Sequence, residues 1–138
     1  MAQVSYGSGE KDDPWVLKTP SQTSEFQVWR DLAAEIPRLV VQVGTTQLSY
    51  QLRGIEDCHA MLKAAGDWVA LGNADEGKPC PAGSIEAWAR DDGNPIGGYY
   101  GLRKGYRGRF ANYVTPVMEL LGLIELEHGA RNNRARAI

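Results

Sequence analysis

Apolar and polar residues alternate in the first third of the chain, which predicts short strands. Residues 48–52 (Leu-Ser-Tyr-Gln-Leu) carry an apolar side chain at every second position, as a half-buried strand does. Residues 39–43 form another apolar run, and Gly44 marks a turn between the two, so we predict a β-hairpin. The spacing of apolar residues in segment 26–36 favours a helix, but its first residues also alternate, so a strand is the alternative there. Residues 14–20, between two prolines, predict an extended strap.

Helical spacing begins in the middle of the chain. An apolar stripe with acidic residues in its first turn predicts a helix over residues 55–65, and Gly66 supplies its end. Residues 67–71 are predicted to form a short strand. Ser84 can cap a brief helix over residues 85–90, because its hydroxyl can accept a bond from a free backbone N–H.

The last third combines a glycine-rich loop, a helical stripe and a hairpin. Residues 91–108 contain seven Gly or Pro residues and predict a flexible or tightly turned loop. Residues 110–121 place apolar residues on one helical face, and Pro116 makes this either one kinked helix or two short ones. Residues 123–128 and 134–138 are predicted to pair as a hairpin. The residues expected in the core of this part are Ile55, Leu62, Trp68, Trp88, Phe110, Val114, Leu121 and Ile124.

Length and composition predict one soluble domain with an extension. The chain has 138 residues, of which 43% are hydrophobic, and no apolar run approaches the length of a membrane span. We therefore expect a cytoplasmic protein with no membrane contact. The expected organisation is a mobile tail at residues 1–13, an N-terminal extension with a β-hairpin at residues 14–53, and a main domain at residues 54–138.

Charge is distributed unevenly along the chain. Residues 1–100 hold eight Lys or Arg against 14 Asp or Glu, a net charge of −6, whereas residues 101–138 hold seven against three, a net charge of +4. A basic segment on an acidic body suggests a face that binds a polyanion. The alternative is that the cations pair with the acidic part of the same chain.

From residue 55 onward the predicted order is helix, strand, helix, helix and two-stranded hairpin. This order resembles the winged helix-turn-helix family. The resemblance implies an α+β fold, a recognition helix around residues 109–121 and a wing tip at residues 129–133. The whole chain, with Asp13-Pro-Trp near its start and the arginine-rich segment 130–138 at its end, also resembles a family of small bacterial proteins of uncharacterised function. That second resemblance implies no activity.

Basic and polar residues in two loops are the candidate binding residues. Four cations precede the expected recognition helix, where guanidinium groups can pair with phosphates. Asn112 lies one turn into that helix and can read an adenine edge, and Tyr106 can stack on a base. The expected nucleic-acid-binding residues are Arg103, Lys104, Tyr106, Arg107, Arg109, Asn112, Arg131, Asn132, Asn133, Arg134 and Arg136.

The sequence provides no convincing chemistry. Cys58 lies on the apolar stripe of its helix, so we interpret it as a core thiol, and Cys80 lies in a loop. Residues 98–105 only superficially resemble a phosphate-binding loop, and the loop acids Asp75 and Glu76 have no partner histidine. We therefore expect no catalytic residue, no metal and no cofactor.

Two functions lead at this point, and an enzyme whose glycine-rich loop borders a pocket comes third. The first is non-catalytic nucleic-acid binding, to DNA rather than RNA. The alternative is a protein-interaction module on the same scaffold. Arginines that converge on a face free of acids would favour nucleic acid, and arginines neutralised by Asp or Glu would favour the interaction module.

Overall fold

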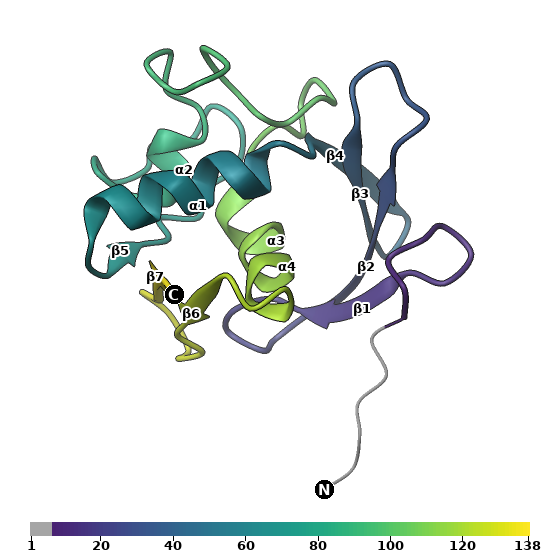
Figure 1. Ribbon diagram of the computed structural model, residues 1–138, viewed down its shortest axis with the longest axis horizontal. Coiled ribbons are helices and arrows are strands. Elements are labelled where there is room, and N and C mark those ends of the chain that lie inside the picture. Colours follow the sequence, from purple (N-terminus) through teal and green to yellow (C-terminus); the bar gives the residue numbers. More distant parts are fainter. Residues whose placement is uncertain (1–6) are drawn as a thin grey trace, which may run out of the picture.

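Two antiparallel sheets flank a pair of short helices in the computed structural model, which describes residues 7–138, and two further helices lie along the upper left side in Figure 1. The first sheet has the order β1-β2-β3-β4. Its strands are β1 (Trp15–Lys18), β2 (Glu25–Asp31), β3 (Arg38–Val43) and β4 (Thr46–Gln51). The hairpin expected from the alternating pattern is β3–β4, with Leu39 opposite Tyr50, and it is confirmed. The expected strap is strand β1, which pairs with β2.

The helix favoured over residues 26–36 is wrong, and the strand that the sequence left open at the front of this segment is confirmed. Its front is β2, in which Phe26 and Val28 are buried while their neighbours Glu25 and Gln27 are exposed. This strand pairs with β1 on one side and with β3 on the other. The hydrogen bonds of two neighbouring strands thus outweigh the weak helical spacing.

The second half of the chain has the element order expected from the sequence. The elements are α1 (Gly54–Ala65), β5 (Val69–Ala70), α2 (Ile85–Trp88), α3 (Phe110–Tyr113), α4 (Thr115–Leu120), β6 (Ile124–Leu126) and β7 (Arg134–Ala137). Gly66 ends α1 in the left-handed conformation, with φ of 68°. Ser84 caps α2 by accepting a hydrogen bond from the Ala87 amide at 3.1 Å. The strands form a second sheet with the order β5-β7-β6, so the structure is α+β with two antiparallel sheets.

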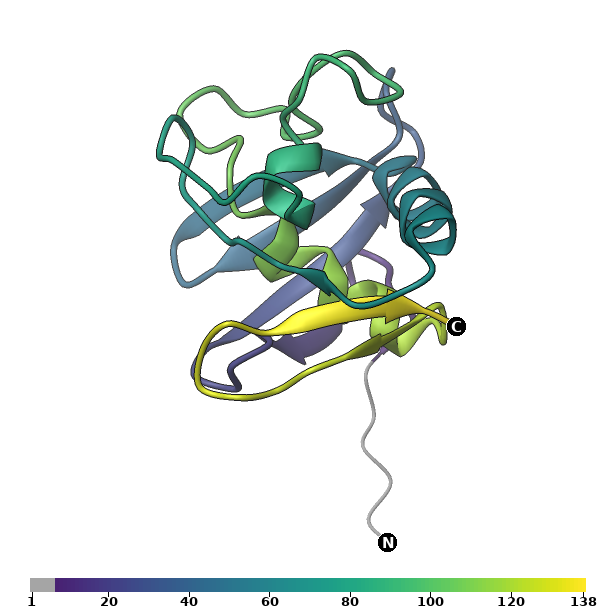
Figure 2. The same cartoon turned by 90° about the vertical axis from the view of Figure 1, so that its left-hand side faces the viewer.

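Pro116 divides the segment after the glycine-rich loop into two short helices, one of the two forms that the sequence allowed. Proline lies in the first turn of α4, where its missing N–H breaks no helical hydrogen bond. The two helices lie between the sheets, as Figures 1 and 2 show from perpendicular directions. Phe26 of the first sheet packs edge-on against Tyr113 of α3, with 5.0 Å between ring centroids.

The predicted core of the second half is largely confirmed. Five of its members are buried: Ile55, Leu62, Phe110, Val114 and Ile124. Trp68 and Trp88 are half-buried. Leu121 is wrong, because its side chain is 46% exposed. The helical break before Pro116 changes the phase of the stripe, and Leu121 lies beyond the last residue of α4.

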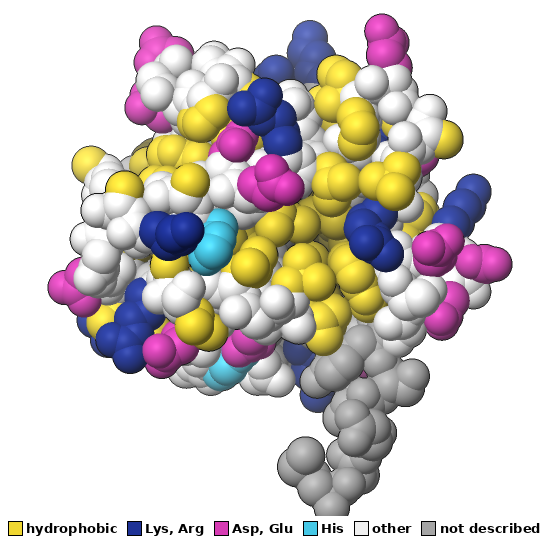
Figure 3. Space-filling model, in the orientation of Figure 1, with side chains coloured by type: hydrophobic (Ala, Val, Ile, Leu, Met, Phe, Trp, Pro, Cys, Tyr) yellow, Lys and Arg dark blue, Asp and Glu magenta, His cyan; other side chains and the backbone are white. Residues whose placement is uncertain are grey.

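Aromatic rings fill the centre of the interior. Tyr100 stacks on Trp88 with 5.2 Å between centroids, and Phe110 contacts Tyr50 edge-on at 5.9 Å. Such pairs stabilise a core beyond the area that they bury. On the face drawn in Figure 3, apolar side chains gather between α1 and the first sheet. Within residues 7–138, no helix has both the length and the apolar character needed to cross a membrane.

Candidate binding groove

Two loops connect β5 with α3: the first loop, residues 71–84, precedes α2, and the second loop, residues 89–109, follows it. The second loop is tightly turned, one of the two forms that the glycine-rich composition of residues 91–108 allowed. Asn94 shapes the second loop: its side-chain amide donates to the carbonyls of Trp88 (2.7 Å) and Gly98 (2.8 Å). Gly108 packs against the backbone of residues 74–76, and a Cβ atom there would lie 2.3 Å from the Glu76 nitrogen. The close approach of two backbones explains why glycine occupies this position.

Glu86 of α2 is the buried carboxylate that joins α2 to the start of α3. Its carboxylate accepts hydrogen bonds from the amides of Phe110 (3.3 Å) and Ala111 (3.0 Å), at the start of α3. Arg90 donates to the same carboxylate at 3.2 Å. Burial raises the pKa of Glu86, against the opposing effect of these bonds. Because helix N-termini leave amides without partners, this carboxylate satisfies groups that would otherwise be buried alone.

A groove of about 460 Å³ opens where these loops meet the first sheet. Its apolar floor consists of Val43 and Leu48 from the β3–β4 hairpin and Tyr113 from α3. Its rim carries Asp75, Glu76, Tyr106 and Arg109, and Thr46 completes the lining together with two loop glycines. This volume lies in the usual range of ligand sites. We refer to this feature as the groove.

The arginines beside the groove are paired with acids from the first loop. Arg107 binds Glu76 in bidentate fashion, with Nε–Oε1 at 2.8 Å and Nη2–Oε2 at 3.2 Å. The same carboxylate accepts from the backbone amides of Gly105 and Arg107. The hydrogen bond from the Arg107 side chain therefore lowers the pKa of Glu76 to about 2.

Arg109 uses its guanidinium differently. Only its Nε donates to Asp75, and within residues 7–138 the two terminal nitrogens donate to no other group. The side chain is 40% exposed and lines the groove. Its backbone is in the left-handed region, with φ of 63°, and its amide donates to the Ala74 carbonyl at 2.8 Å. A bulky residue rarely adopts this conformation, and such outliers are often associated with functional sites.

The last part of the second loop, residues 103–109, borders the groove, and we call it the groove loop. It contains Arg103, Lys104 and Tyr106. Arg103 lies over the Tyr106 ring, 4.3 Å from its centroid, and donates to the Gln47 carbonyl. Tyr106 is 43% exposed. In the described part of the chain, neither Arg103 nor Lys104 has a carboxylate within 4 Å.

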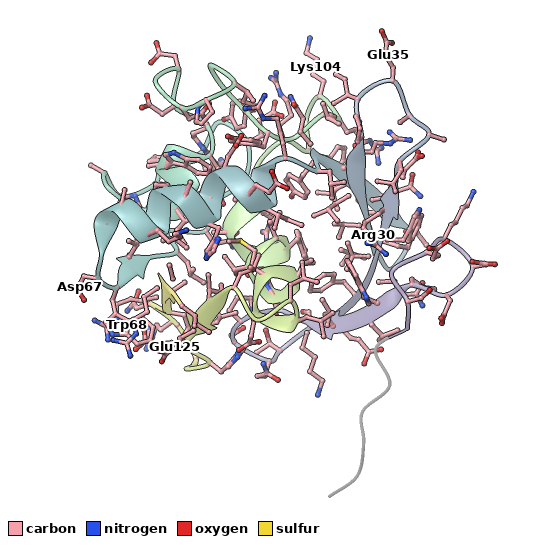
Figure 4. All side chains as sticks on the ribbon, in the orientation of Figure 1. Arg30, Glu35, Asp67, Trp68, Lys104 and Glu125 are labelled. Carbon is pink, nitrogen blue, oxygen red and sulfur yellow. The ribbon has the colours of Figure 1, made fainter. Side chains whose placement is uncertain are left out.

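The arginines of the hairpin form a separate ladder on the second sheet. Arg134 binds Glu127 through two bonds of 2.9 Å, and Arg136 binds Glu125 at 3.0 and 3.2 Å. Both guanidinium groups also lie over Trp68, at 5.1 and 4.6 Å from its centroid. Figure 4 places Trp68 and Glu125 at the lower left and Lys104 at the top, so the ladder and the groove loop occupy different parts of the surface.

The expected wing tip mostly supports its own turn. Asn133 is buried, and its side chain exchanges two hydrogen bonds with the backbone of Gly129 (2.7 and 3.0 Å). Arg131 and Asn132 are exposed, the latter with a positive φ of 57°. The structure thus leaves Arg131 and Asn132 at the tip and turns Asn133 inward.

The segment expected to act as a recognition helix is largely enclosed. Phe110 and residues 113–118 are buried, and Asn112 is half-exposed. The N-terminal sheet covers this segment, through contacts such as Phe26 with Tyr113. The sequence patterns assigned the helix correctly but could not show that another sheet lies on it.

Neither cysteine lies in the groove. Cys58 is fully buried in the core, and burial raises the pKa of its thiol far above the physiological range. Among the residues that the structure describes, no three His, Cys, Asp or Glu side chains are grouped to hold a metal. Groove residues that the sequence patterns missed are Val43, Thr46, Leu48, Asp75, Glu76 and Tyr113. Their common feature is spatial, since they come from three separate segments.

Fold and site define an α+β protein with a groove between one sheet and two ordered loops. Residues 7–138 match the model of the Family of unknown function (DUF6855), and the chain belongs to that family. No curated protein and no solved structure matches the chain.

Proposed function

We propose that this protein is a non-catalytic interaction module whose groove docks a segment of another protein. The observation that carries this proposal is the groove itself, with an apolar floor and an exposed aromatic ring on its rim. Exposed tyrosine and arginine around an apolar centre are typical of residues that dominate protein–protein binding. Tyr106 and Arg109 supply that pair here.

The state of the arginines favours a protein partner over nucleic acid. Arg107, Arg134 and Arg136 each bind a carboxylate of the same chain through two side-chain hydrogen bonds. Nucleic-acid affinity comes mainly from cations that neutralise phosphates, and a cation already paired contributes less to that effect. The enclosed α3–α4 segment also lacks the open face that a helix needs to enter the major groove. DNA binding therefore remains the weaker proposal.

We further propose that residues 54–138 use a winged-helix-like scaffold. The support is the element order α1-β5-α2-α3-α4-β6-β7 together with the sheet order β5-β7-β6. In this arrangement the N-terminal sheet covers the helix that would read bases. The same scaffold can present different surfaces for different functions, so the groove carries the functional argument.

Selection from a random heptapeptide library tests the proposal. We expect enriched peptides to bind the wild type in fluorescence polarisation and to bind the Tyr106→Ala variant at least about fivefold more weakly, since a buried aromatic contact contributes that much. Leu32→Ala is the matched control, because Leu32 is 65% exposed and lies outside the groove. Salt-dependent binding of random duplex DNA without any peptide binding would overturn the proposal.

A further inference from the structure

We propose that Arg109 determines specificity in the groove by binding a carboxylate side chain of the partner segment, next to an apolar partner residue on the floor. This inference rests on the proposed function. It assigns to the partner a short extended segment in which Asp or Glu neighbours an apolar residue.

The first argument is the unused part of the Arg109 guanidinium. Asp75 takes only the Nε–H, whereas Arg107 is bound to Glu76 through both Nε and a terminal nitrogen. The terminal nitrogens of Arg109 therefore keep a planar edge with two parallel donors. Such an edge matches the two oxygens of a carboxylate. Arg109 lines the groove, so the edge is available to an occupant there.

The second argument is that the backbone at Arg109 is held in place before any partner binds. The Arg109 amide donates to Ala74, and its carbonyl accepts from the amides of Asn112 and Tyr113 in α3. Next to it, the carbonyl of Gly108 accepts a 2.6 Å bond from the buried Tyr50 hydroxyl. An anchored binding group loses less conformational entropy on association.

The third argument is the charge around the groove. The groove lining holds Arg109 together with Asp75 and Glu76, and these two acids are ion-paired with Arg109 and Arg107. Two further cations of the adjoining loop, Arg103 and Lys104, have no carboxylate within 4 Å in the described part of the chain, so the surface beside the groove is positive and attracts an acidic occupant. Asp75 lies on the Nε side of Arg109, so an incoming carboxylate meets the least repulsion at the terminal nitrogens.

The fourth argument is the shape of the site. The floor of Val43, Leu48 and Tyr113 is apolar, and the groove holds about 460 Å³. A phosphate backbone offers no apolar group to such a floor, whereas a peptide presents charged and apolar side chains side by side. The combination favours a protein segment over a nucleic acid.

A binding cycle with two peptides and two proteins tests the inference. The acidic probe is a fluorescein-labelled heptapeptide selected on the wild type. The neutral probe is the same peptide with each Asp replaced by Asn and each Glu by Gln. We expect Arg109→Gln to weaken the acidic peptide about tenfold, as a charge-assisted pair would, and to leave the neutral peptide unchanged. Arg38→Gln is the matched control: Arg38 is 39% exposed, pairs with Asp31 at 3.3 Å and lies outside the groove.

The outcomes separate this inference from the proposed function. Equal affinity of the wild type for the acidic and neutral peptides would overturn the inference, even if Arg109→Gln failed to fold. If the peptides still lost affinity on Tyr106→Ala, the proposed function would stand. If no peptide were enriched, or if Tyr106→Ala had no effect, the proposed function would fall and the inference with it.

Discussion

Arginines occur in two regions of the last third of the chain, and their partners come from different distances. In the ladder, Arg134 and Arg136 bind Glu127 and Glu125, which are only seven and eleven residues away on the neighbouring strand. In the groove loop, Arg107 and Arg109 bind acids that are 31 and 34 residues away. The ladder pairs follow from strand register, while the groove pairs depend on how two loops fold onto the core.

The difference has a functional consequence. Cross-strand ion pairs lie on an exposed sheet face, where water and salt weaken them. The groove pairs lie beside a floor of apolar residues, and their loops are held by Glu86, Asn94 and the close contact at Gly108. The ladder can therefore change with little effect on the molecule, whereas the groove depends on buried anchors.

The largest expected effect comes from the anchor of the groove loops. Glu86→Ala should lower the free energy of unfolding by about 3–5 kcal/mol. It leaves the buried amides of Phe110 and Ala111 without their acceptor, and it removes the carboxylate that balances the charge of Arg90, whose guanidinium keeps only backbone carbonyls of the first loop. Urea denaturation measures the change. Glu56→Ala is the control, since Glu56 is exposed on α1. A loss no larger than that of the control would contradict the role of Glu86 as an anchor.

Gly108→Ala should follow, with a loss of about 1–3 kcal/mol, because the new methyl group would overlap the backbone of the first loop. Gly98→Ala provides the comparison within the same loop: a Cβ there meets nothing within 4 Å, and its φ is not positive. In thermal unfolding, Gly108→Ala should therefore have a lower Tm than Gly98→Ala. Equal stability would mean that the first loop can move away from Gly108 without cost.

Replacing both ladder arginines, Arg134 and Arg136, by alanine should cost less stability than Gly108→Ala. Their ion pairs and their contacts with Trp68 are exposed, and such interactions contribute little. Urea denaturation in low and high salt should show the small difference shrinking as salt rises. A loss larger than that of Gly108→Ala would reverse the comparison between the two regions.

The smallest expected effects concern how stability depends on pH, with opposite signs for Glu76 beside the groove and for His128 beside the second sheet. Glu76, beside the groove, has its pKa lowered to about 2, so its contribution to stability is present above pH 4.5 and is lost as the pH falls toward 2. His128, which follows β6 in the turn of the hairpin, behaves in the opposite way. Burial opposes its charge, but Nε2 faces Glu119 at 2.6 Å and Nδ1 faces the Pro20 carbonyl at 2.9 Å, and together these raise its pKa.

The sign for His128 follows from its raised pKa. Its contribution should be complete below pH 6.5 and should disappear as the pH rises through the folded-state value. His128→Gln should therefore destabilise the protein at pH 5.5 and have less effect at pH 8.5, while Glu76→Gln should destabilise it at pH 7 and have little effect near pH 2. Stability curves of both variants measure the effect. Parallel curves for variants and wild type would contradict the assignment.

Elements defined by local spacing could be predicted from the sequence. Each of these elements depends on residues that are close in sequence. They are the apolar stripe of α1 with its end at Gly66, the cap at Ser84 and the β3–β4 hairpin. The charge asymmetry also identified the segment that borders the groove. Local signals suffice where hydrogen bonds join near neighbours in the chain.

Other features were decided by the tertiary structure. Residues 25–31 form a strand because two partners flank them, and Leu121 is exposed because the helix is interrupted before Pro116. The groove arginines are neutralised by Asp75 and Glu76, which no local pattern connects to them. Long-range pairing depends on which loops the folded core brings together. The periodicity of side chains along the chain reflects only near neighbours, so it does not indicate which distant loops come into contact.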